Sequence, residues 1–383
     1  MEKRIFSFFS VLVFTLAFTC CIGCQTEVSA ANAAETPANQ FLYQYSSTYQ
    51  GVELTKYLGE DAVVHIPAEI GGIPVTAIGT ECFYSKKRLK ELIMPDSLMF
   101  IGNQAFYKCL ELEQITWSEN LKSIGKSAFV NCKIKYINMP DSLIYLGDTV
   151  FKDCKSLEEV ICSEGLTELN GTFQGCNNLS IIHLPKSSQF TKIGTGSFAG
   201  CPLGKIEIPA SVTEIGEHVF GSGFKKVTFP KDSRLKKIGH FAFAYCDFKT
   251  ITLPASIEEI GTSLFDNCYS LKKISFEKNA KITKIPAGAF ADCRFLEEID
   301  IPENVTEIGI ALFMDTDHGV YNKIKKINIK GGKIKKIAKG AFNGFIKGGT
   351  ITVPKQYKKK YAKMFKKQKW YKKTMKIKAV KKI

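Results

Sequence analysis

The chain has 383 residues, of which 45% are hydrophobic and 23% are charged, and its formal net charge is +16. Most of this charge lies at one end, because residues 355–383 contain 14 lysines and no acidic residue, which leaves +2 (16 − 14) for residues 1–354. The sequence therefore lacks the basic stripe along the domain that is typical of nucleic-acid-binding proteins, and we expect no nucleic-acid partner.

Residues 1–24 have the plan of a signal peptide, with a short basic start followed by an apolar run. The motif CIGC resembles a bacterial lipobox, in which Cys24 is the lipidated residue, although Cys21 stands where that pattern usually has leucine. Cleavage by signal peptidase near residues 30–34 and retention as an uncleaved anchor are the alternatives. All three place the protein outside the cytoplasm, either on the cell surface as a membrane-anchored lipoprotein or secreted.

Two atypical segments precede the regular part of the chain. Residues 25–40 are small and polar, and we expect a flexible spacer there. Residues 41–79 alternate apolar and polar side chains in short runs, with a turn at Gly71 and Gly72. Because the end of a stack of repeats exposes an apolar cross-section, we interpret residues 41–79 as an N-terminal cap.

A phenylalanine then recurs every 22 to 29 residues. Its twelve copies are Phe83, Phe106, Phe129, Phe151, Phe173, Phe198, Phe220, Phe243, Phe265, Phe290, Phe313 and Phe342. A period of this length sustained over so many copies is the signature of a solenoid, in which each unit contacts its neighbours.

Each unit within residues 80–354 has three parts. The first is an apolar run, LxxIxL, which usually ends at a proline, and the second is a shorter run that ends in IG. Period-two alternation predicts a strand for each run. The third part, GxxAFxxC, is long enough for one turn of helix. We therefore predict a β-dominated repeat solenoid of about 12 strand-turn-strand-helical-turn units of 22–25 residues, with two parallel sheets.

Residues 355–383 form the lysine-rich end of the chain. Tyr357, Tyr361, Met364 and Phe365 recur at helical spacing, which predicts a short C-terminal helix whose aromatic stripe caps the last repeat. The lysines on its other face are also suited to an anionic cell wall or membrane surface.

The unit CxxLxxIxLPxxLxxIGxxAFxx is similar to the leucine-rich repeat of the BspA-like class of surface proteins, and the resemblance covers roughly residues 41–354. It implies an exported leucine-rich repeat protein that binds host or matrix proteins, or other cells. It also implies no catalytic residues, so we expect no enzyme activity.

Eight cysteines share the position three residues after the phenylalanine: Cys109, Cys132, Cys154, Cys176, Cys201, Cys246, Cys268 and Cys293. Side chains at equivalent positions of stacked turns point the same way, which does not suit the crossed geometry of a disulfide. We therefore predict a buried ladder of free thiols. The five histidines are scattered, so we expect no metal site and no cofactor.

The residues on either side of the central isoleucine of the first strand face outward, onto what we expect to be the concave wall. In the early repeats they are Tyr136, Asn138, Glu159, Ile161, Ile181 and His183, whereas the later repeats carry polar side chains. An exposed apolar and aromatic cluster on a rigid sheet is typical of a binding patch. The alternative is ordinary β-propensity on a strand that tolerates it.

These observations lead to two functional hypotheses. The first is an exported cell-surface protein that binds a protein or glycan partner, such as host matrix or other cells, through its concave sheet. The second is a wall-associated structural scaffold that the lysine-rich tail retains, without a specific ligand.

Overall fold

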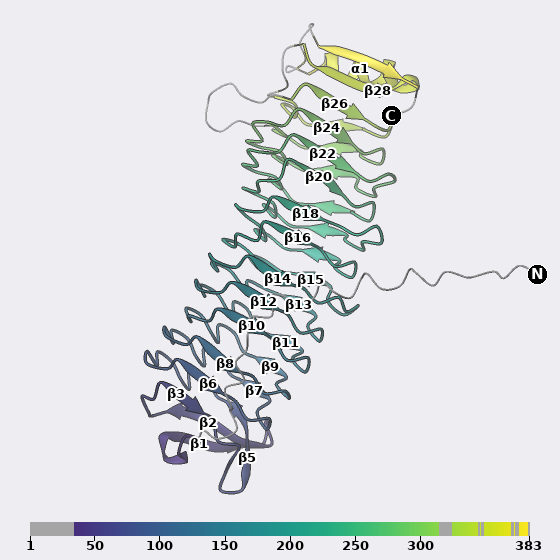
Figure 1. The fold of residues 1–383 in the computed structure, drawn as a ribbon. Coiled ribbons are helices and arrows are strands. Elements are labelled where there is room, and N and C mark those ends of the chain that lie inside the picture. The colour runs from purple at the N-terminus through teal and green to yellow at the C-terminus, as the bar shows by residue number, and fades with distance from the viewer. Residues whose placement is uncertain are drawn as a thin grey trace, which may run out of the picture. The chain divides into compact units, whose positions relative to one another are not determined.

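A computed structural model describes residues 34–313, 324–343, 345, 348–368, 371 and 375–381. The chain divides into two units, residues 1–35 and 36–383. The predicted signal peptide and the predicted lipidation site Cys24 lie outside the described residues. The second unit is a stack of similar turns, as Figure 1 shows.

Each turn contributes one strand to a first series, in which hydrogen-bonded neighbours run parallel. The outward side of this series is called the first face. Its fourteen strands are β3 (Val63–His65), β6 (Glu91–Ile93), β8 (Gln114–Thr116), β10 (Tyr136–Asn138), β12 (Glu159–Ile161), β14 (Ile181–His183), β16 (Lys205–Glu207), β18 (Lys226–Thr228), β20 (Thr250–Leu253), β22 (Lys273–Phe276), β24 (Glu298–Ile301), β26 (Lys326–Ile329), β28 (Thr350–Pro354) and β29 (Lys376–Val380).

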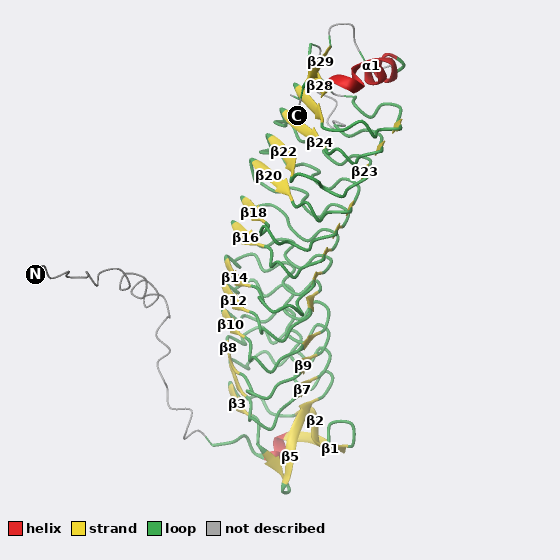
Figure 2. Cartoon of the chain, turned by 90° about the vertical axis from the view of Figure 1, so that its right-hand side faces the viewer, coloured by secondary structure: helices red, strands yellow, loops and turns green. Residues whose placement is uncertain are grey.

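A second series of parallel strands follows the other side of the stack, and its outward side is called the second face (Figure 2). Its strands are β2 (Gly51–Tyr57), β5 (Ile73–Ile78), β7 (Phe100–Ile101), β9 (Ser123–Ile124), β11 (Tyr145–Leu146), β13 (Glu168–Leu169), β15 (Lys192–Ile193), β17 (Glu214–Ile215), β19 (Lys237–Ile238), β21 (Glu259–Ile260), β23 (Lys284–Ile285), β25 (Glu307–Ile308) and β27 (Lys336–Ile337). The predicted solenoid with two parallel sheets is confirmed.

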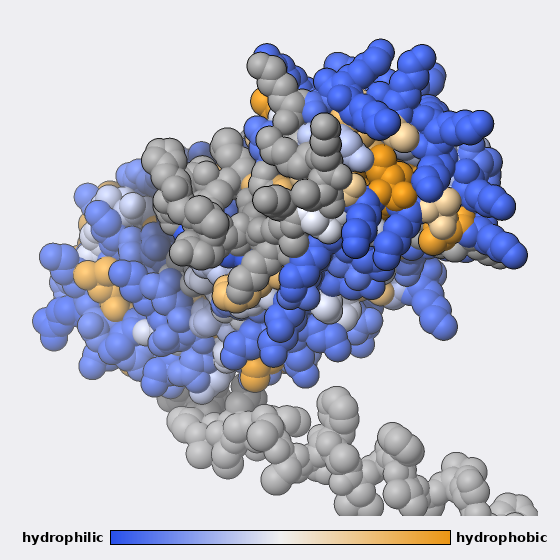
Figure 3. All heavy atoms as spheres, turned by 90° about the horizontal axis from the view of Figure 1, so that it is seen from above, coloured by the Kyte–Doolittle hydropathy of each residue, from blue (hydrophilic) through white to orange (hydrophobic). Residues whose placement is uncertain are grey.

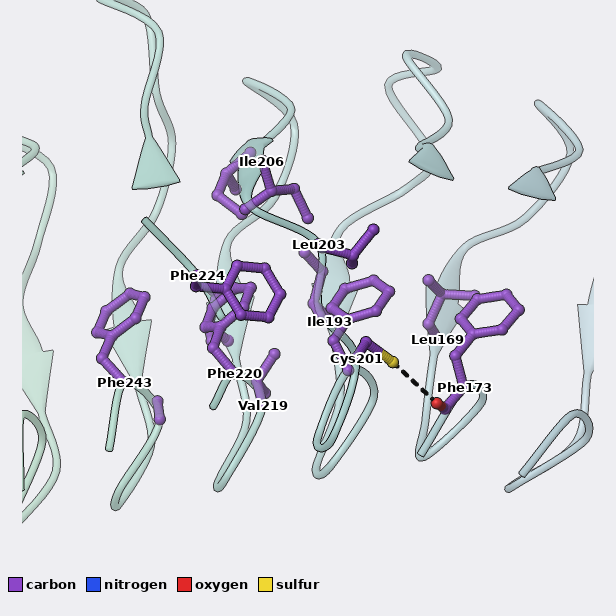
Figure 4. Close-up of a cluster of buried hydrophobic side chains, with 14 of the residues drawn as sticks. Leu169, Phe173, Ile193, Cys201, Leu203, Ile206, Val219, Phe220, Phe224 and Phe243 are labelled. Carbon is purple, nitrogen blue, oxygen red and sulfur yellow. Dashed lines mark hydrogen bonds between the residues drawn. The ribbon is translucent and has the colours of Figure 1, made fainter. Parts of the chain in front are cut away.

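The twelve repeated phenylalanines form one continuous stack through the core. Consecutive ring centroids lie 4.8 to 6.2 Å apart and the rings are nearly parallel. Figure 4 shows part of this stack, with Phe173, Phe220 and Phe243 pointing into the interior. Aromatic pairs of this kind contribute about 0.5–1.5 kcal/mol each beyond the burial of their area. The repeat period of the sequence is thus the period of this stack.

The segment before the cysteine, which we predicted to be a helical turn, is a run of tight turns. In the repeat that contains Phe106, Gln104 and Lys108 have positive φ values of 53° and 59°. The N–H groups of Gln104, Phe106 and Lys108 donate to the carbonyls of residues 126, 128 and 130 in the next turn. These left-handed residues, four positions apart, interrupt the helical path, and every second N–H of the segment points along the stack. A helix would keep these bonds within one turn.

The cysteines form the predicted ladder of buried free thiols. The Sγ of Cys109 donates to the carbonyl of Phe83 at 3.1 Å, and the same bond joins Cys201 to Phe173 (Figure 4). Burial raises the pKa of Cys109 and of Cys201 to about 12. Seven of the eight thiols of the ladder thus fill a small space and give one hydrogen bond to an earlier turn.

The N-terminal end of the stack begins before residue 41, the predicted start of the cap. The N–H of Thr36 donates to the carbonyl of His65, and the N–H of His65 donates to the Thr36 hydroxyl at 3.0 Å. A short 3-10 helix, η2 (Ala38–Gln40), leads into β1 (Phe41–Ser46), which pairs antiparallel with β2, and β4 (Glu69–Ile70) pairs antiparallel with β5. Residues 36–40 of the predicted spacer thus belong to the stack.

The C-terminal end contains the predicted helical cap and one further strand. A 3-10 turn, η3 (Lys355–Tyr357), leads into α1 (Lys358–Lys366), whose Tyr361 and Phe365 are buried. The strand β29 then pairs in parallel with β28. Figure 3 views the molecule from the end that carries α1, where hydrophilic side chains surround a small apolar area. Among the described residues, no helix is both long enough and apolar enough to cross a membrane.

Candidate functional site

The six predicted binding residues lie together on one three-stranded sheet, β10-β12-β14. The register places them in two rows across the strands: Tyr136, Glu159 and Ile181 in one row, and Asn138, Ile161 and His183 in the other. Residues that are partners in a parallel ladder have side chains on the same face. All six therefore share one small area of the first face.

Three of these residues form an exposed apolar cluster, defined here as Tyr136, Ile161 and Ile181. Their exposed fractions are 64%, 43% and 47%. The alternation of the strand explains the placement, because the residues between them, such as Ile137 and Val160, point inward and are buried. Large apolar side chains are thus exposed to solvent, on a sheet whose central strand β12 is hydrogen-bonded on both sides.

Polar groups border the apolar cluster. The Tyr136 hydroxyl donates to Oε2 of Glu158 at 3.1 Å, and this bond raises the pKa of Tyr136 above its ordinary value. The Nε2 of His183 lies 3.5 Å from Oε1 of Glu159, which makes an ion pair when the imidazole is protonated. An apolar centre with a polar border is the usual composition of a protein-binding surface.

The three-stranded sheet is separated from its neighbours, because β10 is not paired with β8 and β16 is not paired with β14. At these two breaks, the number of positions from the repeated phenylalanine to the first residue of the next first-face strand differs from that in the paired turns. This connection spans eight positions from Phe106 to Gln114 but seven from Phe129 to Tyr136. Seven positions also precede β16 and β20, and these three strands each lack the pairing with the preceding one.

The loss of pairing goes with connections of seven positions, since β26, which follows a connection of 13 positions, keeps its pairing with β24. In agreement, β18 follows a connection of six positions and keeps its pairing with β16. The ladder of the first face is thereby cut into segments, and the candidate site occupies one whole segment. The predicted concavity of the first face stays a prediction.

A family model for the BspA type leucine-rich repeat region, with six copies, matches residues 76–191, 169–232, 221–320 and 320–383. The chain belongs to the BspA-type leucine-rich repeat family. This BspA-type assignment agrees with the resemblance drawn from the repeat unit, and the matching model describes repeats rather than a catalytic domain. No curated protein matches the chain.

Two solved structures with the same repeat fold illustrate how the BspA-type chain relates to known proteins. A leucine-rich cell surface protein from Faecalibacterium prausnitzii is 26% identical, with a TM-score of 0.52 over 82% of this chain and 98% of that one. A leucine-rich repeat protein from Bacteroides ovatus is 22% identical, with a TM-score of 0.51 over 91% of this chain and 100% of that one. The second likeness concerns the fold alone.

The BspA-type chain also exposes apolar residues that the sequence analysis did not select. Tyr145 on the second face is 58% exposed, Ile144 immediately before β11 is 56% exposed, and Leu42, Tyr43 and Tyr45 are exposed on β1. The alternation of the second strand contained the signal for Tyr145, because its neighbour Leu146 is the inward residue. In the part of the chain that the structure describes, no three metal-ligating residues form a group that could hold an ion.

Proposed function

We propose that this protein is an exported cell-surface protein that binds a protein or glycan partner through its first face. The observation that carries the proposal is the apolar cluster of Tyr136, Ile161 and Ile181, exposed on one hydrogen-bonded sheet. A rigid aromatic anchor with aliphatic neighbours supplies contact area at a low cost in conformational entropy. Asn138, Glu159 and His183 are the polar contacts that border this anchor.

Export rests on the apolar segment within residues 1–24, and the likeness to a cell surface protein supports an extracellular location. The partner is then an extracellular molecule, such as a host matrix protein or a component of another cell. Lipidation at Cys24 is our proposed mode of anchoring, and mass spectrometry of the mature N-terminus tests it, since a diacylglyceryl mass on Cys24 is expected. A mature chain that starts near residues 30–34 would contradict lipidation.

The binding test uses two variants that lose exposed apolar side chains on different parts of the same region of the stack. One carries Tyr136→Ser, Ile161→Ser, Ile181→Ser and His183→Ser on the first face. Its control carries Tyr145→Ser on the second face and Ile144→Ser immediately before β11. We expect the first variant to lose at least about tenfold in affinity for immobilised matrix proteins or host cells, because truncated anchors cost about 2 kcal/mol or more. Equal binding by both variants, with unchanged thermal unfolding, would remove the cluster from consideration.

A second candidate function is a scaffold that the C-terminal lysines hold on an anionic wall. The lysines of α1 favour it, since Lys358, Lys359, Lys363 and Lys366 are exposed while the aromatic side of the helix is buried. Replacing these four lysines with glutamine keeps the packed side. Loss of wall retention together with unchanged partner binding is the result that this function predicts.

A further inference from the structure

Charges on the second face alternate strictly from turn to turn. From β13 to β27, the outward residues are Glu168, Lys192, Glu214, Lys237, Glu259, Lys284, Glu307 and Lys336. Neighbours in this row are register partners wherever the strands pair. Four of the pairs form ion pairs with N···O distances of 2.6 to 4.0 Å. Each of the four lysines of this row is therefore offset by a carboxylate one turn away.

The first face has a different arrangement between β16 and β22. Six exposed lysines, here called the lysine cluster, gather there: Lys205, Lys225, Lys226, Lys249, Lys272 and Lys273. Lys205 is the register partner of Lys226, so two lysines stand at the same position on neighbouring strands. The N–H of Lys272 donates to the carbonyl of Lys249, which places these two lysines on adjacent turns as well.

Carboxylates offset the lysine cluster less completely than they offset the row of lysines on the second face. Among the described residues, no carboxylate lies within 4.0 Å of the ammonium group of any of the six lysines. Glu298 is the register partner of Lys273 and interacts with its charge, although Glu298 and Glu297 form their ion pairs with Lys326 and Lys325 at 3.0 and 3.2 Å. Glu207 on β16 is one acidic residue within the area. The cluster therefore keeps an excess of positive charge.

Like charges that face each other across strands lower the stability of a sheet. The second face demonstrates that this chain can avoid the cost with glutamate at the equivalent position. Because the repulsion between facing lysines is present on the first face and avoided on the second, we infer that the positive charge has a function. Positive potential attracts anionic partners. The cluster starts at β16, the strand that follows β14 in the first series, so it directly continues the face that carries the apolar cluster.

We propose that the lysine cluster is the electrostatic half of the docking face, and that the partner is a protein segment with carboxylates beside an aromatic or apolar side chain. This inference rests on the proposed function. A protein segment satisfies both halves, because its carboxylates oppose Lys205, Lys226 and Lys249 while its apolar residue covers Tyr136 and Ile181. A sulfated polysaccharide offers charge for the lysines but no apolar side chain for the cluster.

The test uses the full chain and three defined probes: a copolymer of glutamate and tyrosine, poly-glutamate of the same length, and heparin. We expect the copolymer to bind more tightly than poly-glutamate, and binding of both to weaken with salt. The variant with Lys205→Ser, Lys226→Ser and Lys249→Ser is expected to bind both acidic polymers about tenfold more weakly. Its matched control, Lys192→Ser, Lys237→Ser and Lys284→Ser on the second face, removes the same charge and is expected to change binding less than about twofold.

Each remaining outcome contradicts one part of the account. Equal losses in the two lysine variants would overturn the inference, because net charge alone would then explain binding. Binding of heparin without binding of the copolymer would also overturn it in favour of a polyanionic glycan. A third variant, Tyr136→Ser with Ile181→Ser, is expected to lose the preference for the copolymer. If that preference persists while the two lysine variants still differ, the proposed contact with Tyr136 and Ile181 is wrong. The proposed role of the lysine cluster is then retained.

Discussion

Within each turn, the phenylalanine and the cysteine stabilise the stack in different ways. Phe129 packs between Phe106 and Phe151, with ring centroids 4.9 and 5.5 Å away, so it contributes to two interfaces between turns. Cys132 is also buried, and its thiol donates to the carbonyl of Phe106 at 3.2 Å. The first residue supplies contact area and the second supplies one hydrogen bond.

Replacement of these two residues is expected to lower the free energy of unfolding by different amounts. Phe129→Ala leaves a cavity in the stack and is expected to cost about 3–5 kcal/mol. Cys132→Ala removes one weak hydrogen bond and a small volume, and is expected to cost about 1–2 kcal/mol. Urea denaturation of both variants measures the difference. Equal losses would contradict the distinction between the two positions.

Alkaline pH is expected to destabilise the fold through the thiols. Burial raises the pKa of Cys109, Cys154 and Cys201 from 9.0 to about 12. Above pH 9 the unfolded chain releases these protons while the folded chain keeps them, so stability is present below pH 9 and falls as pH rises toward 12. Each thiol contributes about 1.4 kcal/mol per pH unit in this window.

Denaturation of the wild type and of the Cys109→Ala, Cys154→Ala, Cys201→Ala variant at pH 8 and pH 10.5 measures this effect. The variant starts less stable and is expected to lose less over the interval. A loss as large as that of the wild type would assign the alkaline effect to other groups.

The sequence analysis predicted these inward residues because the period of Phe83 to Phe342 defines equivalent positions in every turn. It did not predict the thiol-to-carbonyl bonds, because they depend on the axial offset between turns, which the period does not specify. It also did not select Tyr145, since exposed aromatics on a two-residue strand resemble ordinary surface side chains in the sequence.

Among the secondary-structure elements, the strands of the first face form ladder segments whose ends coincide with the seven-position connections. The N–H groups of Glu158 and Glu159 both donate to the carbonyl of Lys135, the usual bond between turns. Their counterparts in β10, the N–H groups of residues 135 and 136, lie at the segment end, where β8 is not paired. Backbone protection is therefore expected to vary along the first face.

Hydrogen exchange is expected to be faster at the amides of residues 135 and 136 than at those of residues 158 and 159. Insertion of one glycine after Lys133 restores eight positions and is expected to slow exchange at the shifted tyrosine. Equal protection at the two sites in the wild type would refute an interruption of the ladder before β10.

The charge rows make a second prediction for the strands. Lys226→Glu places a carboxylate opposite Lys205 and is expected to raise the free energy of unfolding by about 0.2–1 kcal/mol. Lys237→Glu places three acidic residues in succession on the second face and is expected to lower it by a similar amount. Thermal denaturation of the two variants checks the signs, and a gain in both would show that net charge, rather than pairing, sets the result.

Strand positions and their inward sides were predictable from the alternation of runs such as IKYIN. The shape of the turn segment was not, because its left-handed positions are often occupied by residues other than glycine, such as Ser127 and Asn131. Such residues give little sign of positive φ in one sequence. The conformation is determined instead by the backbone N–H and C=O groups of each turn, which must form hydrogen bonds with the neighbouring turn.

For the stack as a whole, stability depends on covered ends, since each turn contacts its neighbours. Tyr57 stacks on Phe83 at one end, and Phe365 contacts Phe342 edge-on at the other. The lysine-rich tail is therefore part of the fold as well as a source of charge. The sequence predicted the helix from its aromatic spacing but not β29, because the alternation of Lys376–Val380 is hidden in a run of lysines.

Deletion of residues 355–383 is expected to lower the melting temperature, because it exposes the apolar cross-section that α1 and β29 cover. Thermal unfolding compares this truncation with the chain in which Lys358, Lys359, Lys363 and Lys366 are glutamine. The glutamine variant is expected to melt close to the wild type. An unchanged melting temperature for the truncation would mean that the tail is not a cap.

The central claim is that the partner covers the first face and leaves the second face free. Tyr136 and Tyr145 test it within one turn, because they lie on opposite faces with exposed fractions of 64% and 58%. Hydroxyl-radical footprinting of the chain, alone and bound to host matrix or cells, measures both tyrosines in one experiment. Protection of Tyr136 with unchanged labelling of Tyr145 is the predicted result, whereas protection of Tyr145 alone, or of neither residue, would contradict the account.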